Sequence, residues 1–276
     1  MSAAQLGFVI IGIAIALSVL MSCAWAIERR TGNSGWIDTV WTFGLGAIGF
    51  AYAMVPFGFW PVANGPRRIL VAGAALVWAL RLGVHIARRT AGIADDPRYA
   101  ALRRGFGAQA WWQMWLLVQK QALVSIPFAL AMVLAAANPA PGLTLQDYVA
   151  ALIFVIAVAG EAVADGQLRR FRRASSGHAG ICDVGLWRWS RHPNYFFEWL
   201  GWLAYPLIAI GPGYPWGWIA LAGPACMYAL LVYVSGIPPL EQHMLQTRGD
   251  AFRAYRARTN AFFPWPPRER TKTALP

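Results

Sequence analysis

The most restrictive feature of this sequence is a series of apolar segments that can each cross a membrane as a helix. About 20 helical residues cover the roughly 30 Å hydrocarbon core of a bilayer, and inside that core a helix satisfies every backbone polar group by itself. Seven segments fit, the sixth only if it begins earlier, near Pro193. They are Leu6–Ala26, Trp36–Val55, Ile69–Ile86, Trp112–Ala136, Leu145–Ala164, Phe196–Ile210 and Trp216–Val234. We therefore expect an all-α, polytopic integral membrane protein with seven transmembrane helices.

The composition supports this expectation and excludes several other classes. Hydrophobic residues make up 58% of the chain and charged residues only 13%, whereas about a quarter of a soluble domain is charged. The net charge of +12 does not indicate a nucleic-acid-binding protein, because the arginines lie beside the apolar spans and not in a separate basic domain. Neither the cysteines nor the histidines have the spacing of a disulfide framework or a metal site. The first apolar run lacks the basic start of a signal peptide and reads as a retained span.

The basic residues predict an orientation. They are concentrated after the first, third and fifth spans and in the C-terminal tail, where Arg270 and Lys272 belong to the last group. The opposite side carries only Arg67 and Arg68. By the positive-inside rule the N-terminus lies outside and the C-terminus in the cytoplasm.

A polar and aromatic stretch, Gly185 to Trp202, runs directly into an apolar segment. Pro193 suits the first turn of a helix, which places Arg191 and His192 just before that helix. Asn194 and Glu198 then share one face. An interfacial belt of tryptophans and arginines is the simpler explanation, but it leaves Glu198 unexplained, because an unpaired charge in an apolar run costs about 2.5–3.5 kcal/mol.

The end of the fifth span carries acids followed by arginines on one helical stripe. Glu161, Asp165, Arg169 and Arg172 fall at positions i, i+4, i+8 and i+11. A ladder of salt bridges explains part of this pattern. The arginines can also bind the phosphates of a large anionic cofactor.

Loop three, on the same predicted side, adds a second group of charged residues that can close over the same ligand. This group comprises Asp96, Arg98, Tyr99 and Arg103.

Polar residues inside the predicted spans are candidates for function, because each must find a partner or line a wet cavity. Asp38 opens the second span, Lys120 lies in the fourth, and Arg81, His85 and Arg89 recur every four residues along the third. Internal ion pairs, such as Asp38 with Arg81 or Lys120, are the alternative to ligand contacts.

One apparent motif carries no function. Gly44 to Gly49 matches G-x-G-x-x-G, but no strand precedes it and it lies within a span, so it is not a dinucleotide fingerprint. These glycines are expected to let helices approach closely.

Several motifs resemble the steroid 5-alpha-reductase family, particularly its bacterial members. The residues that carry the resemblance are Asp165-x-x-x-Arg169-x-x-Arg172, Gly185-Leu186-Trp187, Asn194-Tyr195-x-x-Glu198-Trp199, and Tyr255 with Pro264. His85, Arg89 and Thr90 are similar to the family's His-x-x-x-Arg-Thr segment. The match covers about Asp165 to Pro264 well and the N-terminal half loosely.

The resemblance implies a seven-helix membrane reductase that uses NADPH to reduce the carbon–carbon double bond of an enone. It divides the single domain, residues 1–276, into a substrate side at 1–144 and a cofactor-binding half at 145–276. The cytoplasmic loops then form the cofactor site. The residues predicted to bind NADPH are Arg89, Asp96, Arg98, Tyr99, Arg103, Asp165, Arg169, Arg172, Trp187, Arg191, His192, Asn194, Tyr195, Glu198 and Glu241.

On the substrate side the sequence departs from the family. The family's Gln-Glu pair on the second helix corresponds at best to Ile37-Asp38, and its partner tyrosine falls on Ile86. Asp38, if protonated, or His85 is the predicted catalytic donor to the carbonyl oxygen. The expected substrate is an apolar enone from the bilayer, such as a 3-oxo-delta-4 steroid or a terpenoid. Membrane lipids are the other expected partners, the protein is expected to be a monomer, and no metal is predicted.

A second resemblance keeps another enzyme class open. Arg191-His192-Pro193-x-Tyr195 with a downstream glutamate is also similar to the isoprenylcysteine carboxyl methyltransferases, which bind S-adenosylmethionine. The acid-then-arginine stripe favours the reductase, because S-adenosylmethionine carries no phosphate. A non-catalytic lipid-binding protein is the third alternative, although the sequence lacks the paired broken helices of transporters.

Overall fold

The computed structural model describes residues 1–55, 65–174 and 180–268, so the predicted tail residues Arg270 and Lys272 lie outside the described part. Within these ranges the chain is helical and contains no strand. It divides into two compact units. The first comprises Met1–Ala151 and Tyr205–Gly223, and the second comprises Leu152–Ala204 and Pro224–Pro276.

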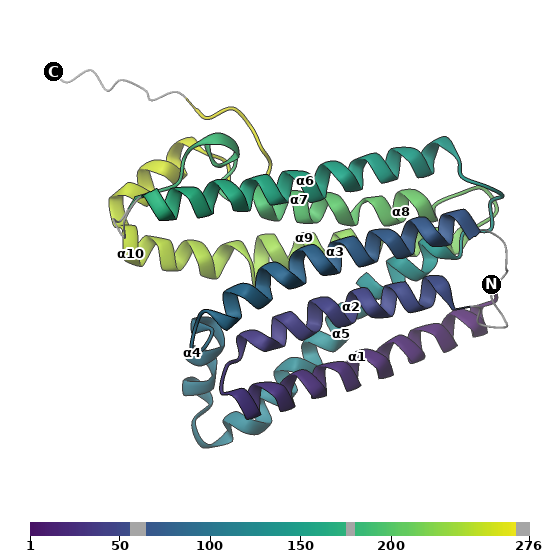
Figure 1. Ribbon diagram of the computed structural model, residues 1–276, viewed down its shortest axis with the longest axis horizontal. Helices are drawn as coiled ribbons and strands as arrows, with labels where there is room; N and C mark the ends of the chain where they lie inside the picture. Colours follow the sequence, from purple (N-terminus) through teal and green to yellow (C-terminus); the bar gives the residue numbers. More distant parts are fainter. Residues whose placement is uncertain (56–64, 175–179, 269–276) are drawn as a thin grey trace. The chain divides into compact units, whose positions relative to one another are not determined.

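The first unit is built on four long helices, which confirm the predicted helical character of the first four apolar segments. They are α1 (Ala3–Thr31), α2 (Gly35–Met54), α3 (Gly65–Ala91) and α5 (Ala110–Ala136). A short helix α4 (Pro97–Phe106) and a turn η1 (Gly107–Gln109) precede α5. Figure 1 shows α4 at the end of the unit where α1 stops and α2 starts.

Glycines on α2 explain how closely it packs on its neighbours. A Cβ atom at Gly46 would lie 2.2 Å from the Cβ of Ala79 on α3, and one at Gly49 would lie 2.1 Å from the Sδ of Met132 on α5. Helices that approach this closely need small residues at the contact. The structure therefore confirms that the G-x-G-x-x-G segment serves helix packing.

The basic residues at the opposite end of the unit are engaged within the protein. Arg67 is buried, with its side chain 1% exposed, and its Nη2 lies 2.7 Å from Oδ2 of Asp147. The Arg67 guanidinium also donates to the carbonyls of Asn138, Ala140 and Gly142. Arg68 donates to the carbonyls of Ala53 and Met54 at the end of α2. Both charges are thus held by internal acceptors.

The remaining helices are divided between the two units, with residues Tyr205–Gly223 belonging to the first unit. They are α6 (Leu145–Ala174), η2 (Gly185–Arg188), α7 (Pro193–Trp202), α8 (Ala204–Ala209), η3 (Pro215–Leu221), α9 (Ala222–Ala229), η4 (Leu230–Val234) and α10 (Ile237–Arg258). α6 starts in the first unit and continues into the second.

Six helical stretches in the described part of the chain are long and apolar enough to cross a membrane: Ala3–Thr31, Gly35–Met54, Gly65–Ala91, Pro97–Ala136, Leu145–Ala174 and Pro215–Arg258. These stretches indicate an integral membrane protein. The predicted sixth span, Phe196–Ile210, is not among them, so the prediction of seven spanning helices is confirmed only in part.

The sixth predicted segment is interrupted because of a proline. α7 ends at Trp202, Leu203 leaves the helix, and α8 begins at Ala204. Pro206 has no N–H to donate to the carbonyl of Trp202, and its ring disfavours a continuous helix at that point. The segment therefore consists of two short helices.

The start of α7 is where the sequence predicted it. The helix begins at Pro193, and His192 is the residue just before it. Proline in the first turn gives up only an N–H that has no partner inside the helix. Arg191 and His192 consequently lie outside the helix, and Asn194 and Glu198 lie within it.

Candidate functional site

The first unit contains a cluster of acids and arginines formed by Asp38, Arg89, Asp96, Arg98 and Tyr99. It begins with Asp96, which caps α4: Oδ1 accepts a hydrogen bond of 3.0 Å from the backbone N–H of Arg98. Pro97 occupies the first turn of that helix. An aspartate followed by proline is a strong start signal for a helix, so the local sequence fixes the position of Asp96.

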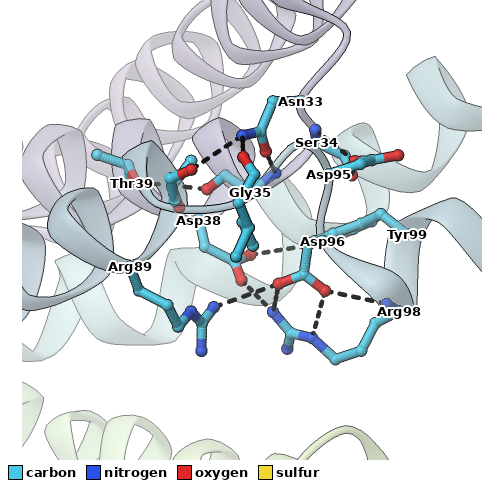
Figure 2. A network of polar contacts seen from close by, with 12 residues as sticks. Asn33, Ser34, Gly35, Asp38, Thr39, Arg89, Asp95, Asp96, Arg98 and Tyr99 are labelled. Atoms are coloured by element: carbon cyan, nitrogen blue, oxygen red, sulfur yellow. Dashed lines mark hydrogen bonds and ion pairs between the residues drawn. The ribbon is translucent and has the colours of Figure 1, made fainter.

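Two arginines converge on the Asp96 carboxylate (Figure 2). Arg98 donates to it through Nε at 3.1 Å and through Nη2 at 3.0 Å, and Arg89 donates through Nη2 at 3.3 Å. Burial alone would raise the pKa of Asp96, but the hydrogen bonds and positive charges of Arg98 and Arg89 hold that pKa below its ordinary value. Asp96 is thus an ionised, buried acid whose charge is neutralised inside the protein.

Arg98 links Asp96 to Asp38 on α2. Its Nη2 lies 2.6 Å from Oδ2 of Asp38. The sequence predicted Arg81 or Lys120 as an ion-pair partner for Asp38, but the structure shows this ion pair to Arg98. An arginine in direct contact favours the charged form of a carboxyl group.

Tyr99 supplies a second contact to Asp38. Its hydroxyl donates to Oδ1 of Asp38 at 2.7 Å and accepts a hydrogen bond of 2.7 Å from Nε2 of Gln121 on α5. The Tyr99 side chain is buried, and that of Asp38 is 23% exposed. The first unit therefore presents a hydroxyl donor and a carboxylate side by side at the start of α2.

Arg103, which the sequence assigned to the cofactor, is engaged with two acids. It donates to Oε1 of Glu28 at 2.7 Å and also to Asp95. Asp95 in turn accepts a hydrogen bond of 2.9 Å from the backbone N–H of Ser34. These contacts tie α4 to the end of α1 and the start of α2.

Of the other predicted residues, His85 is half-buried on α3 and Lys120 is exposed on α5.

In the second unit, the residues before α7 form a compact ionic group. Nε of Arg191 lies 2.7 Å from Oε1 of Glu241 on α10, and Nε2 of His192 lies 3.1 Å from the same oxygen. The His192 ring stacks on Tyr195, with ring centroids 5.5 Å apart. Burial lowers the pKa of His192, although its hydrogen bond to Glu241 opposes that effect. The structure therefore brings together Arg191, His192, Tyr195 and Glu241, which the sequence assigned to one cofactor site.

The face of α7 predicted from the sequence has two polar contacts. Nδ2 of Asn194 lies 3.4 Å from Oδ1 of Asp165 on α6. One turn further on, Glu198 accepts a 2.9 Å hydrogen bond from the indole N–H of Trp202. Asp165 is 6% exposed and Glu198 is 9% exposed. The second unit thus presents an amide and two buried carboxyl groups on facing helices.

The part of the loop around Trp187, before α7, is held by uncharged hydrogen bonds. The indole of the buried Trp187 donates to the carbonyl of Ala164 at 3.0 Å, and the Tyr255 hydroxyl donates to the carbonyl of Trp187. The backbone N–H of Leu186 donates to Gln167 at 2.9 Å. Trp187 therefore has a packing role that its prediction as a cofactor residue did not foresee.

The predicted phosphate-binding residues Arg169 and Arg172 lie near the end of α6, where both side chains are exposed. Arg172 forms no ion pair with another described residue. In the part of the chain that the structure describes, no group of three or more His, Cys, Asp or Glu side chains could hold a metal ion. The chemistry available here is anion binding by arginine.

Sequence reasoning missed Gln121 and Glu28. Gln121 belongs to the polar run Gln119-Lys120-Gln121 inside an apolar segment, and this run was a usable signal because intramembrane polar residues need partners. Glu28 directly precedes two arginines, so the sequence indicated a charged helix end exposed to solvent. In the structure Glu28 is only 3% exposed.

Comparison with known proteins identifies a family and little more. A family described as "Protein of unknown function (DUF1295)" matches residues 24–259. No curated protein and no solved structure matches the chain. Because the matched region covers most of the sequence, including both sets of polar residues described above, this chain belongs to the DUF1295 family, a family of membrane proteins related to the steroid 5-alpha-reductases.

Proposed function

We propose that this protein is a membrane-embedded reductase that uses NADPH to reduce the carbon–carbon double bond of an apolar enone. The observation that carries the proposal is the hydrogen bond of 2.7 Å from the Tyr99 hydroxyl to Asp38. It places a proton donor beside a carboxylate in a unit made of apolar helices. The relation of the family to the steroid 5-alpha-reductases supports the same reaction class.

The residues of the second unit fit a nicotinamide nucleotide. Arg169 and Arg172 are exposed at the end of α6, where guanidinium groups can bind phosphates in a bidentate manner. The Asn194 amide and the carboxyl groups of Asp165 and Glu198 match the donors and acceptors of a nicotinamide carboxamide. When bound, NADPH would supply the hydride.

Tyr99 is the best candidate for the donor to the carbonyl oxygen. Addition of hydride to the β-carbon of an enone moves an electron pair onto that oxygen, and a donor placed there stabilises the developing charge. Asp38 is ion-paired with Arg98 and accepts a hydrogen bond from the Tyr99 hydroxyl. We assign Asp38 the role of positioning Tyr99 until the substrate carbonyl replaces it as the acceptor. The enolate then takes one proton from water at its α-carbon, so that the net reaction consumes one NADPH and one proton.

This assignment replaces the tyrosine that the family places on the third helix. The corresponding position here is Ile86, but Tyr99 on α4 reaches Asp38 from another direction. His85, half-buried on α3, is the alternative donor.

We further propose the topology predicted from the sequence, with seven spans, the N-terminus outside, and the bacterial cytoplasmic membrane as the location. In this topology α7 and α8 together form the sixth span. Internal acceptors hold Arg67 and Arg68, which leaves little free positive charge at that end of the first unit. The asymmetry in accessible charge is thus larger than the sequence alone indicates. An apolar substrate, steroid-like or terpenoid, would enter from the lipid.

The test is nucleotide oxidation by the purified protein in detergent or vesicles, with NADPH and a panel of steroid and terpenoid enones. We expect substrate-dependent oxidation of NADPH, and a loss of about 10²-fold or more in Tyr99→Phe, because a general acid contributes on this scale. Asp38→Asn should lose less, since an amide still accepts a hydrogen bond from Tyr99. Oxidation that survives in Tyr99→Phe but disappears in His85→Ala would transfer the donor role to His85.

Two outcomes would contradict the proposal as a whole. One is the absence of enone-dependent oxidation across the panel. The other is saturable binding of S-adenosylmethionine in place of NADPH, which would favour the methyltransferase class. Glu198→Gln serves as a check on the second unit: it should retain the bond to Trp202, fold normally and reduce turnover.

A further inference from the structure

We propose that Gln121 is a positioning residue for Tyr99: its side-chain amide holds the phenolic oxygen in place and stabilises negative charge on it. Gln121 lies on α5 and donates through Nε2 to the Tyr99 oxygen at 2.7 Å. The inference rests on the proposed function insofar as Tyr99 is the donor to the substrate.

The chemistry of the three groups determines which atom donates to which. In the substrate-free protein the single hydroxyl proton of Tyr99 is donated to Oδ1 of Asp38; when an enone binds, the hydroxyl turns this proton to the carbonyl oxygen while its oxygen keeps accepting from Gln121. If the Gln121 amide were turned round, its oxygen would face a phenolic oxygen that has no second proton to give. The NH₂ group must therefore point to Tyr99, and the chain of donors runs from Gln121 to Tyr99 to Asp38.

The two partners act on Tyr99 in opposite ways. Hydrogen-bond donation to an oxygen favours its charged form, whereas a carboxylate beside it disfavours that form. Among the described residues, two groups contact this hydroxyl: Gln121 from α5 and Asp38 from α2. Asp38 also forms an ion pair with Arg98 on α4. Gln121 is thus the contact that stabilises the negative charge that builds on the Tyr99 oxygen while its proton is shared with the enolate.

A simple tether between α4 and α5 would not require this geometry. α4 is already fastened by Arg103 to Glu28 and by Arg98 to Asp38. Loss of the Gln121 contact should therefore leave α4 in place. A tether and a positioning residue differ in one respect: only the loss of a positioning residue changes the ionisation of Tyr99.

The experiment compares Gln121→Met, which keeps the length of the side chain but removes the donor, with Gln119→Met as a matched control. Gln119 lies two residues away on the same helix, and its amide contacts Ser18 and Ser22. We expect Gln121→Met to lower kcat about tenfold, with KM for NADPH unchanged, and to move the alkaline limb of the pH profile to higher pH. Gln119→Met should match the wild type in both.

A second readout does not depend on activity. The protein is labelled with fluorotyrosine, whose phenol ionises at lower pH than that of tyrosine, and the Tyr99 fluorine resonance is assigned by its absence in Tyr99→Phe. Gln121→Met should shift the titration of that resonance to higher pH, and the Gln119→Met control should not. If Gln121→Met fails to fold, Gln121→Asn, whose amide is one methylene shorter, replaces it with the same expectation.

The outcomes separate this inference from the proposed function. An unchanged Tyr99 titration in Gln121→Met overturns the inference even where the enzyme reduces enones normally. A shifted titration supports the coupling even if no enone is reduced, in which case only the reductase assignment is lost.

Discussion

Two sets of arginines, which look alike in the sequence, are used differently in the two units of this protein. In the first unit, Arg89 and Arg98 bind Asp96, and Arg103 binds Glu28. In the second unit, Arg172 at the end of α6 is exposed and forms no ion pair with a described residue. The arginines of the first set complete the fold, and Arg172 has charge to offer to a ligand.

The difference teaches that a cluster of arginines indicates a phosphate site only when acids do not already occupy it. Asp95 and Asp96 lie within loop three itself, whereas Asp38 and Glu28 come from α2 and α1. An arginine held by a buried carboxylate would have to break that contact before it could bind a phosphate, and breaking a buried pair is costly. The arginines of loop three are consequently weaker candidates for NADPH than those of α6.

The largest expected effect comes from removing the acid at the centre of the first set. Asp96→Ala deletes the cap of α4 and leaves Arg89 and Arg98 without their common partner. We expect a loss of about 2–3 kcal/mol in the free energy of unfolding, less than for a fully buried pair because Arg98 is half-exposed. Thermal or denaturant unfolding in detergent measures it. The control is Asp250→Ala, whose ion pair with Arg253 is exposed and whose loss should leave the melting temperature unchanged.

The next effect concerns ligand affinity. Arg172→Ala should weaken NADPH binding by about 1.5–3 kcal/mol, the value of a charge-assisted contact, without changing the melting temperature. Affinity for NADH should fall less if Arg172 contacts the 2′-phosphate. Titration calorimetry of Arg172→Ala and Arg98→Ala, with Arg104→Ala as an exposed arginine for comparison, checks this. The distinction between the two sets fails if Arg98→Ala weakens NADPH binding as much as Arg172→Ala does while remaining fully stable.

A smaller effect is expected at Trp187 in the loop before α7, which an uncharged hydrogen bond from Tyr255 holds. The hydroxyl of the buried Tyr255 donates to the carbonyl of Trp187, so Tyr255→Phe should cost about 1 kcal/mol. Unlike the ion pairs of the first unit, this contribution should not change with ionic strength. Unfolding of Tyr255→Phe and Asp96→Ala at low and high salt compares the two. Equal salt dependence of both losses would show that charges contribute to the Tyr255–Trp187 contact as well.

The smallest effect is a difference in how residues of the two units make the stability depend on pH. The lowered pKa of His192 means that its neutral form is favoured in the folded state, so its contribution is complete above the unfolded pKa of about 6.5 and is lost as the pH falls through the folded value. The lowered pKa of Asp96 gives a contribution that is complete above about 3.9 and is lost on further acidification. When the pH is lowered from 7 to about 5, the wild type should therefore lose more of its free energy of unfolding than His192→Asn does. Asp96→Asn should lose as much as the wild type over the same range. A loss of equal size in His192→Asn would assign this pH dependence to other groups.

The sequence was informative wherever a property depends on neighbouring residues. The apolar segments predicted the helices of the first unit, Pro193 predicted the start of α7, and the spacing of Asn194 and Glu198 predicted their shared face, which Trp202 continues. It did not predict the break at Leu203 within Phe196–Ile210, although the position of Pro206 indicates such a break. The rejection of Gly44 to Gly49 as a nucleotide loop followed from hydropathy, and close packing against α3 and α5 confirms it.

The sequence by itself determined that this chain is a helical membrane protein with acids and arginines at the helix ends, because hydropathy and helical periodicity are local properties. Only the tertiary structure decided which charges meet. Asp38 found Arg98 and Tyr99, which lie about 60 residues away in the chain, and Gln121 found Tyr99 across another helix. Such pairs depend on how helices are stacked and rotated about their axes, which packing between distant segments decides. Asp38, which the sequence predicted as a proton donor to the substrate, therefore accepts a hydrogen bond from Tyr99 in the fold.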